Sequence, residues 1–199
     1  MATDPSTQDP AASTRDEILR ATMACFERYG RRKTTMEDIA RASGVSRKTV
    51  YRHFASKDEL ITAFSDQETL RVCTTTQAQL DLSLPAAELI ADAEWRLLRA
   101  GWDGPRAHLN QEDELGYTMR IMEHSGRRAE IIAEYWAPVF DQLERAGVLR
   151  TDVSREEMTA WILLIHTALL TSTTAPAVPD EIHLRRLRLL LAPAVLKSG

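Results

Sequence analysis

Six side chains between residues 47 and 57 have the chemistry to bind nucleic acid. They are Arg47, Lys48, Thr49, Tyr51, His53 and Lys57. The first three stand at the start of an expected helix, where their hydrogen-bond donors can meet base edges in a DNA major groove. The tyrosine and the histidine that follow are placed to reach backbone phosphates. The spacing predicts a helix that reads bases near its first turn and meets phosphates along its flanks.

Lys57 lies at the start of a further expected helix. The run from Ser56 to Glu59 is a capping box, which satisfies backbone N–H groups at a helix start. A helix N-terminus carries partial positive charge, so with the lysine ammonium it can hold a phosphate. The alternative is that Tyr51 and His53 pack against the first helix and that the charges form a solvated face.

A shorter helix must precede the base-reading segment. Thr35 and Asp38 form a capping-box-like pair, which starts a helix near Met36. Gly44 can take the left-handed conformation that ends such a helix without steric cost. A tight turn over residues 43–45 then follows.

Ser46 is placed to cap the second helix, which is expected over residues 47–54. Val50 and Phe54 lie four residues apart and should point into a small core. Arg52 falls on the opposite, exposed face with the other basic side chains. Two short helices joined in this way form a helix-turn-helix.

The ordered series TT-x-x-x-IA-x-x-x-GVS-x-x-T-x-YRHF-x-SK-x-EL resembles the DNA-binding domain of the tetracycline-repressor (TetR) family of bacterial regulators. The expected helix over residues 14–29, followed by Gly30, fits the first helix of that family, and the match covers about the first third of the chain. The resemblance implies phosphate contacts from Thr35, Tyr51, His53 and Lys57, and base or groove contacts from Glu37 and residues 47–49. Ser46 and Arg52 complete the candidate DNA-binding set. An acid at Glu37 either reads a cytosine amino group or faces solvent.

Charge is distributed unevenly along the 199 residues, whose net charge is −4. Residues 13–58 hold 11 Lys and Arg against 6 Asp and Glu, a net +5, so residues 1–12 and 59–199 carry −2 and −7. A basic head on an acidic body limits nonspecific wrapping and directs the head toward DNA. The expected domains are a disordered tail (1–12), a helix-turn-helix domain (13–60) and a helical regulatory domain (61–199).

Cysteine usage and hydropathy predict a reduced, cytoplasmic protein that does not contact a membrane. Only Cys25 and Cys73 occur, and no signal peptide or membrane-spanning apolar run is visible. We expect Cys25 to be a buried small hydrophobe rather than a redox group.

The helical periodicity continues to the C-terminus, which predicts an all-α fold of about nine helices. After the helix that runs past Ile61 toward Leu80, further helices are expected over about 85–101, 106–123, 127–146, 154–169 and 180–196. Pro138 should kink the segment 127–146 near residues 134–136.

The last two expected helices carry more apolar surface than one face can bury. Their candidate dimer-interface residues are Met158, Trp161, Ile162, Ile165, Leu169, Leu187, Leu190 and Leu191. The TetR resemblance implies that these helices pair with their copies in a four-helix homodimer interface. The alternative is that both are core helices of a monomer.

The resemblance also implies a small-molecule effector pocket in the helical body. Large or adaptable side chains that could line it are Trp95, Trp102, Met119, Met122, Tyr135, Trp136, Phe140 and His166. For each of them, packing in the core is the alternative. An apolar or aromatic effector would suit this set, and no cofactor is expected.

Enzymatic function has little support. His108 and Glu112 lie four apart on one expected helix and could hold a metal only with a third ligand such as Glu114 or His124. No nucleophile elbow, phosphate loop or CxxC pair occurs. We therefore expect no catalytic residue and no metal, and a repressor that leaves a palindromic operator when an effector binds. The alternatives are an activator or ligand-independent regulator, and an architectural DNA-binding protein.

Overall fold

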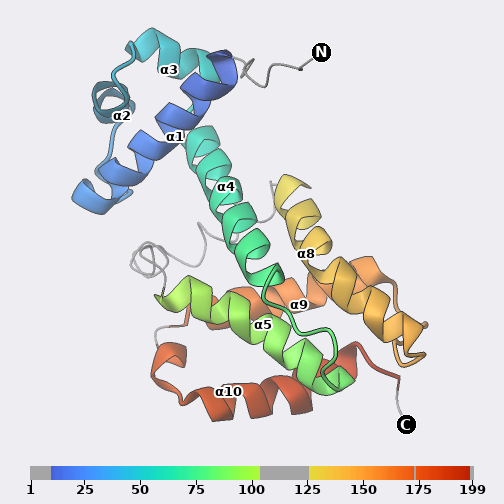
Figure 1. The fold of residues 1–199 in the computed structure, drawn as a ribbon. Helices are drawn as coiled ribbons and strands as arrows, with labels where there is room; N and C mark the ends of the chain where they lie inside the picture. The colour runs from blue at the N-terminus through green and yellow to red at the C-terminus, as the bar shows by residue number, and fades with distance from the viewer. Residues whose placement is uncertain (1–9, 104–125, 173, 198–199) are drawn as a thin grey trace, which may run out of the picture. The chain divides into compact units, whose positions relative to one another are not determined.

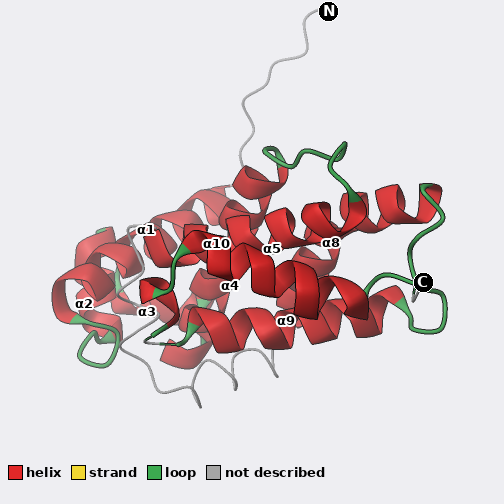
Figure 2. Cartoon of the chain, turned by 90° about the horizontal axis from the view of Figure 1, so that it is seen from below, coloured by secondary structure: helices red, strands yellow, loops and turns green. Residues whose placement is uncertain are grey.

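A computed structural model describes residues 10–103, 126–172 and 174–197 of the chain, which divides into two compact units, Met1–Ser65 and Asp66–Gly199. The described secondary structure is helical apart from one isolated antiparallel bridge between Leu149 and Leu196 (Figures 1 and 2). None of the described helices is both long and apolar enough to cross a membrane.

The first unit contains three helices and the start of a fourth. They are α1 (Pro10–Tyr29), α2 (Met36–Ser43), α3 (Arg47–His53) and α4 (Lys57–Gln77), the last of which continues into the second unit. One small core joins them, because Ile18, Phe26, Ile39, Val50 and Leu60 are all almost fully buried. The apolar positions three and four residues apart on each helix thus face a common centre.

The helix ends in this unit differ in detail from the expected ones. Helix α1 begins at Pro10, earlier than expected, since proline fits the first turn of a helix; residues 10–12 therefore belong to it, and residues 1–9 of the expected tail lie outside the described part. Helix α3 ends at His53, because Phe54 is extended with φ −141°. Helix α4 ends at Gln77, short of Leu80.

The second unit is built around α5. Its other α-helices are α8 (Gly126–Arg145), α9 (Arg155–Leu170) and α10 (Asp180–Arg186), and α5 itself spans Ala86–Asp103. Helix α5 contacts all three of them, so its apolar side chains, including Leu89, Ile90 and Leu98, are fully buried. Figure 2 colours the described helices and the loops that connect them.

The described residues contain eight α-helices rather than about nine. The helix expected over residues 106–123 lies outside the described part. The expected last helix is also divided: α10 gives way to a π-helical turn at Leu187–Leu191 and a 3-10 turn at Ala192–Ala194. Pro193 explains the change, because it has no backbone N–H to continue an α-helical ladder.

A side chain of α4 compensates for the proline within α8. Pro138 cannot donate to the carbonyl oxygen of Glu134, four residues earlier. Gln77 Nε2 instead donates to the carbonyl oxygens of Glu134 at 2.8 Å and Tyr135 at 3.1 Å. The polar group that proline leaves open is thus satisfied by the last residue of α4.

Candidate nucleic-acid interface

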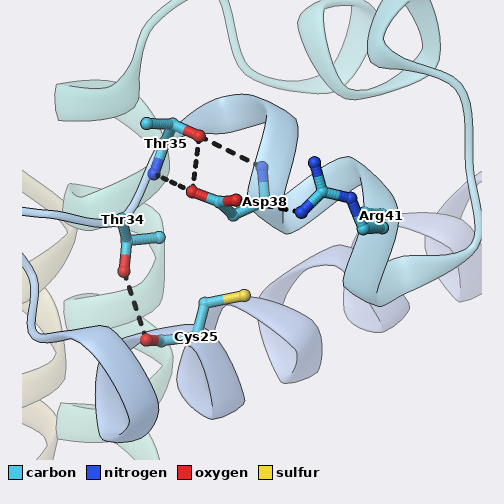
Figure 3. Close-up of polar contacts among 5 residues, drawn as sticks. All are labelled: Cys25, Thr34, Thr35, Asp38 and Arg41. Atoms are coloured by element: carbon cyan, nitrogen blue, oxygen red, sulfur yellow. Dashed lines mark hydrogen bonds and ion pairs between the residues drawn. The ribbon is translucent and has the colours of Figure 1, made fainter.

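The connection between α1 and α2 is held by two threonines (Figure 3). Thr34 is buried, and its hydroxyl lies 3.2 Å from the carbonyl oxygen of Cys25 and 2.9 Å from that of Gly30. Thr35 caps α2: its Oγ1 accepts from the backbone N–H of Asp38 at 3.2 Å. The predicted role of Thr35 and Asp38 at this helix start is confirmed.

The cap also fixes the charge state of Asp38. Thr35 donates to Asp38 Oδ2 from its backbone N–H at 3.0 Å and from its hydroxyl at 2.6 Å. These two bonds, with a smaller effect of Arg41, hold the pKa of Asp38 below its ordinary value. The exposed Thr35 hydroxyl therefore has a structural role beside the phosphate contact expected of it.

The turn between α2 and α3 has the expected geometry. Gly44 lies in the left-handed region with φ 71° and ends α2. Ser46 caps α3 by accepting from the N–H of Thr49 at 3.1 Å, and the two hydroxyl oxygens lie 2.8 Å apart. Both side chains are thus held at the first turn of α3, where Ser46 acts as a helix cap.

The two faces of α3 differ as the sequence predicted. Val50 is fully buried, and the side chains of Arg47, Lys48, Tyr51 and Arg52 are exposed. Thr49 is half-buried. The helix therefore presents a basic face and a tyrosine to solvent, while its other face packs into the unit.

Arg47 is held by residues of two helices. Its Nη1 lies 2.6 Å from Glu37 Oε1 on α2, and its guanidinium lies 5.3 Å from the centre of the Tyr51 ring. A hydrogen bond with Tyr51 and the charge of Glu37 raise the pKa of Arg47 above its ordinary value. In this structure Glu37 contacts the candidate base-reading arginine, a contact that the sequence did not suggest.

His53 and Lys57 are only partly exposed to solvent. His53 is half-buried, and its Nε2 has no hydrogen-bond partner among the described residues. Lys57 Nζ donates to the carbonyl oxygen of Arg32 at 3.3 Å. Partial burial and the neighbouring positive charge of Arg31 lower the pKa of Lys57.

The start of α4 is capped nearly as expected. The backbone N–H of Glu59 donates to Ser56 Oγ at 3.0 Å, while Glu59 Oε2 accepts from the N–H of Ala55 at 2.7 Å. One bond of the capping box joins Ser56 and Glu59 as expected, whereas the other reaches the backbone of Ala55 instead of Ser56. Lys57 occupies the first position of the helix.

The candidate pocket residues that the structure describes are mostly packed core. Trp95 and Trp102 surround the buried His183, with ring centres 5.1 and 5.2 Å from its imidazole. Tyr135, Trp136 and Phe140 are almost fully buried on α8 and contact one another through their rings. Met119 and Met122 lie outside the described residues.

His166 is the polar member of this set, and it pairs with a residue that the sequence analysis missed. Its Nδ1 lies 2.9 Å from Oε1 of Glu94, a carboxyl group on α5 that is fully buried. An acid between Ile90 and Leu97, on the apolar side of the helix, was the available indication.

The candidate dimer-interface residues fall into two groups. Met158, Ile162, Leu187 and Leu191 are buried in the core of this chain, so they cannot line a surface for another copy. Trp161 and Leu190 are exposed, at 48% and 76%, and Ile165 and Leu169 are partly buried. Leu164, Ile182 and Leu189 in the same segments are also exposed.

The candidate metal ligands His108, Glu112, Glu114 and His124 lie outside the described residues. Within the part of the chain that the structure describes, no group of three His, Cys, Asp or Glu residues is placed to hold a metal ion. Cys25 and Cys73 are both free and buried.

Residues 18–64, which contain the helix-turn-helix, match the sequence pattern of the bacterial regulatory proteins of the tetR family. The HTH-type transcriptional repressor Rv1474c of Mycobacterium tuberculosis is 26% identical over 178 residues, 88% of this chain and 90% of that protein. The HTH-type transcriptional regulator TtgR of Pseudomonas putida is 40% identical over 60 residues, 30% of this chain and 29% of its own length.

The similarity in fold extends beyond the helix-turn-helix. FadR of Thermus thermophilus, a TetR-family transcriptional repressor solved in complex with lauroyl-CoA, superposes with a TM-score of 0.63 at 22% identity. The superposition covers 93% of this chain and 96% of FadR. Residues 18–64 of this chain therefore form a DNA-binding domain of the tetR family of bacterial regulatory proteins, and the chain as a whole is similar to a repressor of the helix-turn-helix type.

Proposed function

We propose that this regulator is a repressor that binds a palindromic operator as a homodimer and leaves it when a small molecule binds the helical unit. The observation that carries the proposal is the division of α3 into a buried face and an exposed basic face. A helix of this kind fits a major groove, with its first turn toward the bases.

Within this proposal, Arg47 and Lys48 read bases and the surrounding residues hold the DNA backbone. An arginine at the first turn can donate two parallel hydrogen bonds to a guanine. Tyr51, His53 and Lys57 supply phosphate contacts, and Arg52 adds positive charge on the exposed face. Because DNA is the proposed partner, we propose that the protein acts in the cytoplasm.

The homodimer is proposed on the exposed apolar side chains of the last helical segments. Trp161 and Leu164 on α9, and Leu189 and Leu190 after α10, expose large apolar surfaces to water. Such surfaces commonly mark protein–protein contacts. Two recognition helices also give the affinity and half-site spacing that one short helix does not supply.

The effector response is proposed from relatives together with the aromatic content of the second unit. FadR of Thermus thermophilus holds lauroyl-CoA, so a fold of this kind can accept a molecule with a long apolar part. The buried rings of α5 and α8 provide an apolar environment for such a ligand. A ligand that favours one arrangement of the helices weakens DNA binding by the same free energy.

The test is selection of DNA sequences by the purified full-length protein from a random pool. We expect an inverted repeat to be enriched and to be bound in the presence of excess random DNA, since base contacts add to the phosphate term. Equal affinity for all sequences at a fixed salt concentration would instead identify an architectural DNA-binding protein. Reporter expression from the selected operator, with and without the regulator gene, separates repression from activation.

A further inference from the structure

A carboxyl group in the second unit is buried with half of its hydrogen-bonding capacity unmet. Glu94 on α5 is 0% exposed. Its Oε1 is bonded to His166 Nδ1 on α9 at 2.9 Å, but its Oε2 is buried without a hydrogen-bond partner among the described residues.

The groups around Glu94 come from the helices that form the core of the second unit. Its charge contributes to raising the pKa of Cys73 on α4 and of Tyr135 on α8, so the carboxyl lies near both. The Tyr135 hydroxyl donates to the carbonyl oxygen of Ala93 at 2.8 Å. The carboxyl therefore lies among α4, α5, α8 and α9, and the Tyr135 hydroxyl donates to a backbone oxygen rather than to Glu94.

His166 places this pair between the core and the surface. Its side chain is 15% exposed, whereas that of Glu94 is completely enclosed. On α8, which also carries Tyr135, Trp136 and Phe140 stack with their ring centres 5.9 Å apart. The pair is thus a polar group in an otherwise apolar and aromatic part of the unit.

This arrangement is unfavourable for stability alone. Buried polar atoms in native proteins are hydrogen-bonded with few exceptions, and an unmet carboxyl oxygen retains its full desolvation cost. A well-packed apolar side chain would often serve a core at least as well as a buried ion pair. A buried acid with one unmet oxygen is therefore a candidate for binding a ligand.

We propose that Glu94 and His166 are the polar anchor of the effector site, and that the effector is an apolar, ring-containing molecule that presents a hydroxyl or amino group to Glu94 Oε2. The inference rests on the proposed function, because it names the ligand class of the same helical unit. A hydroxyl or an ammonium can donate to the unmet oxygen, whereas a carboxylate ligand would face a like charge.

Three small compounds test this chemistry on the full-length protein: 2-phenylethylamine, 2-phenylethanol and 3-phenylpropanoate. They share a phenyl ring and a two-carbon chain and differ only in the terminal group. Their dissociation constants are measured by ligand-observed NMR titration. We expect the amine or the alcohol to bind at least about tenfold more tightly than the carboxylate, and which of the two does so identifies the donor.

Two substitutions assign the effect to the carboxyl group. Glu94→Gln keeps an oxygen for His166 but replaces the charge, so the amine should lose about tenfold in affinity and the alcohol less. Glu94→Met removes both oxygens, so both donors should bind no better than the carboxylate. Glu134→Gln, at an exposed position of the neighbouring α8, is the matched control and should change none of the three constants.

Stability of the ligand-free protein separates a binding role from a structural one. If Oε2 awaits a ligand, the double variant Glu94→Met/His166→Leu should melt at or above the temperature of the unmodified protein, because it removes an unmet buried oxygen without leaving His166 unpaired. A clear fall in melting temperature would show that Glu94 is a structural partner of His166 and would overturn the proposal. So would equal binding of the three compounds, binding of none of them, or dissociation constants unchanged in both variants.

The proposed function can survive that result. Operator selection requires only the DNA-binding unit and the dimer. If the protein binds a specific operator but does not prefer the amine or the alcohol over the carboxylate, the effector anchor is refuted and the proposed function stands. Loss of specific DNA binding with an intact donor preference refutes the repressor and leaves the ligand site standing.

Discussion

Arg47 illustrates how single residues prepare the proposed DNA contact. Its guanidinium bonds Glu37 and lies over the Tyr51 ring before any DNA is present. An arginine whose planar group is already oriented loses less conformational freedom on binding. Both side chains of the ion pair are largely exposed, so the pair itself stabilises the fold little and can open when a base competes for the guanidinium.

Replacing Arg47 and Lys57 should have different consequences. Arg47→Ala should cost about 1–3 kcal/mol at one base pair of each half-site and relax preference there. Lys57→Ala should weaken binding to all DNA sequences by a similar factor. It should also reduce the slope of log affinity against log salt concentration by about 1 for each protomer. Titrations of the selected operator and of single-base variants, at several salt concentrations, measure both effects.

The control for these titrations is Arg186→Ala, which removes one exposed positive charge from the second unit. It should leave both the base preference and the salt slope unchanged. A uniform loss across all operator variants for Arg47→Ala would contradict a base-reading role.

Cys73 makes stability depend on pH in the alkaline range. Burial, with a smaller effect of Glu94, raises the pKa of this thiol from 9.0 to about 12. Between these values the unfolded chain loses the proton while the folded protein keeps it, so stability is complete below pH 9 and falls as the pH rises. The loss from this group should be about 1 kcal/mol between pH 9 and pH 10.

Urea denaturation of the protein and of Cys73→Ala, at pH 8, 9 and 10, checks this expectation. The variant has a constant offset from the lost sulfur contacts, and its free energy of unfolding should fall less steeply with pH. Parallel pH profiles for the two proteins would contradict a protonated, buried thiol.

At the scale of elements, a side chain of α4 bonds a backbone oxygen of α8 that has no partner within its own helix. Pro138 removes the intrahelical partner of the Glu134 carbonyl oxygen, and Gln77 supplies a replacement. The kink expected at this proline stays a prediction. The amide of Gln77 ties the end of one helix to the backbone of another.

A double-mutant cycle tests this compensation. Gln77→Ala should reduce the free energy of unfolding by about 1–3 kcal/mol, because it leaves a carbonyl oxygen unsatisfied. In a Pro138→Ala background the restored N–H can bond that oxygen, so the same change should cost at least about 0.5 kcal/mol less. Urea denaturation measures all four proteins.

Gln79→Ala is the matched substitution, at an exposed position two residues after α4. It should change stability by no more than about 0.5 kcal/mol. Equal losses from Gln77→Ala in both backgrounds would show that its bond to Glu134 does not depend on the proline.

The whole molecule combines a basic DNA-binding unit with an acidic helical unit that exposes apolar side chains. The net charge of +5 over residues 13–58 contrasts with −7 over residues 59–199. This distribution favours approach of the first unit to DNA and opposes coating of DNA by the second. Large apolar side chains of the last helical segments are exposed to water, and we propose that a second copy of the chain covers them.

Charges introduced into those residues should separate the proposed dimer. Trp161→Glu combined with Leu190→Glu should give a monomer by analytical ultracentrifugation, because burying two carboxylates in an apolar interface is costly. Operator affinity should fall by at least about tenfold, since two half-sites are no longer bound together.

Leu70→Glu is the control for this pair of substitutions, since Leu70 is an exposed apolar residue of α4 outside the proposed interface. It should leave the sedimentation coefficient unchanged. A dimer that persists in the double variant would place the interface elsewhere.

The local parts of the fold could be predicted from sequence because their hydrogen bonds join residues close in the chain. Thr35 with Asp38 and Ser154 with Glu157 form capping boxes at the expected helix starts, and Gly44 takes the left-handed turn. Val50 and Phe54 are buried as their four-residue spacing predicted, although Phe54 lies one residue beyond the end of α3.

Contacts between distant segments were decided only by the tertiary structure. Glu37 beside Arg47, Gln77 beside Glu134 and Glu94 beside His166 join residues from different helices, and helical periodicity does not say which helices meet. Periodicity likewise does not show which apolar residues of α9 are buried and which are exposed: Ile162 is buried, whereas Trp161 is exposed. The sequence by itself determined a DNA-binding helix-turn-helix in an all-helical regulator, because caps and amphipathic spacing are local. Which side chains form the core, a proposed dimer surface or a proposed effector anchor depends on the packing of one helix against another.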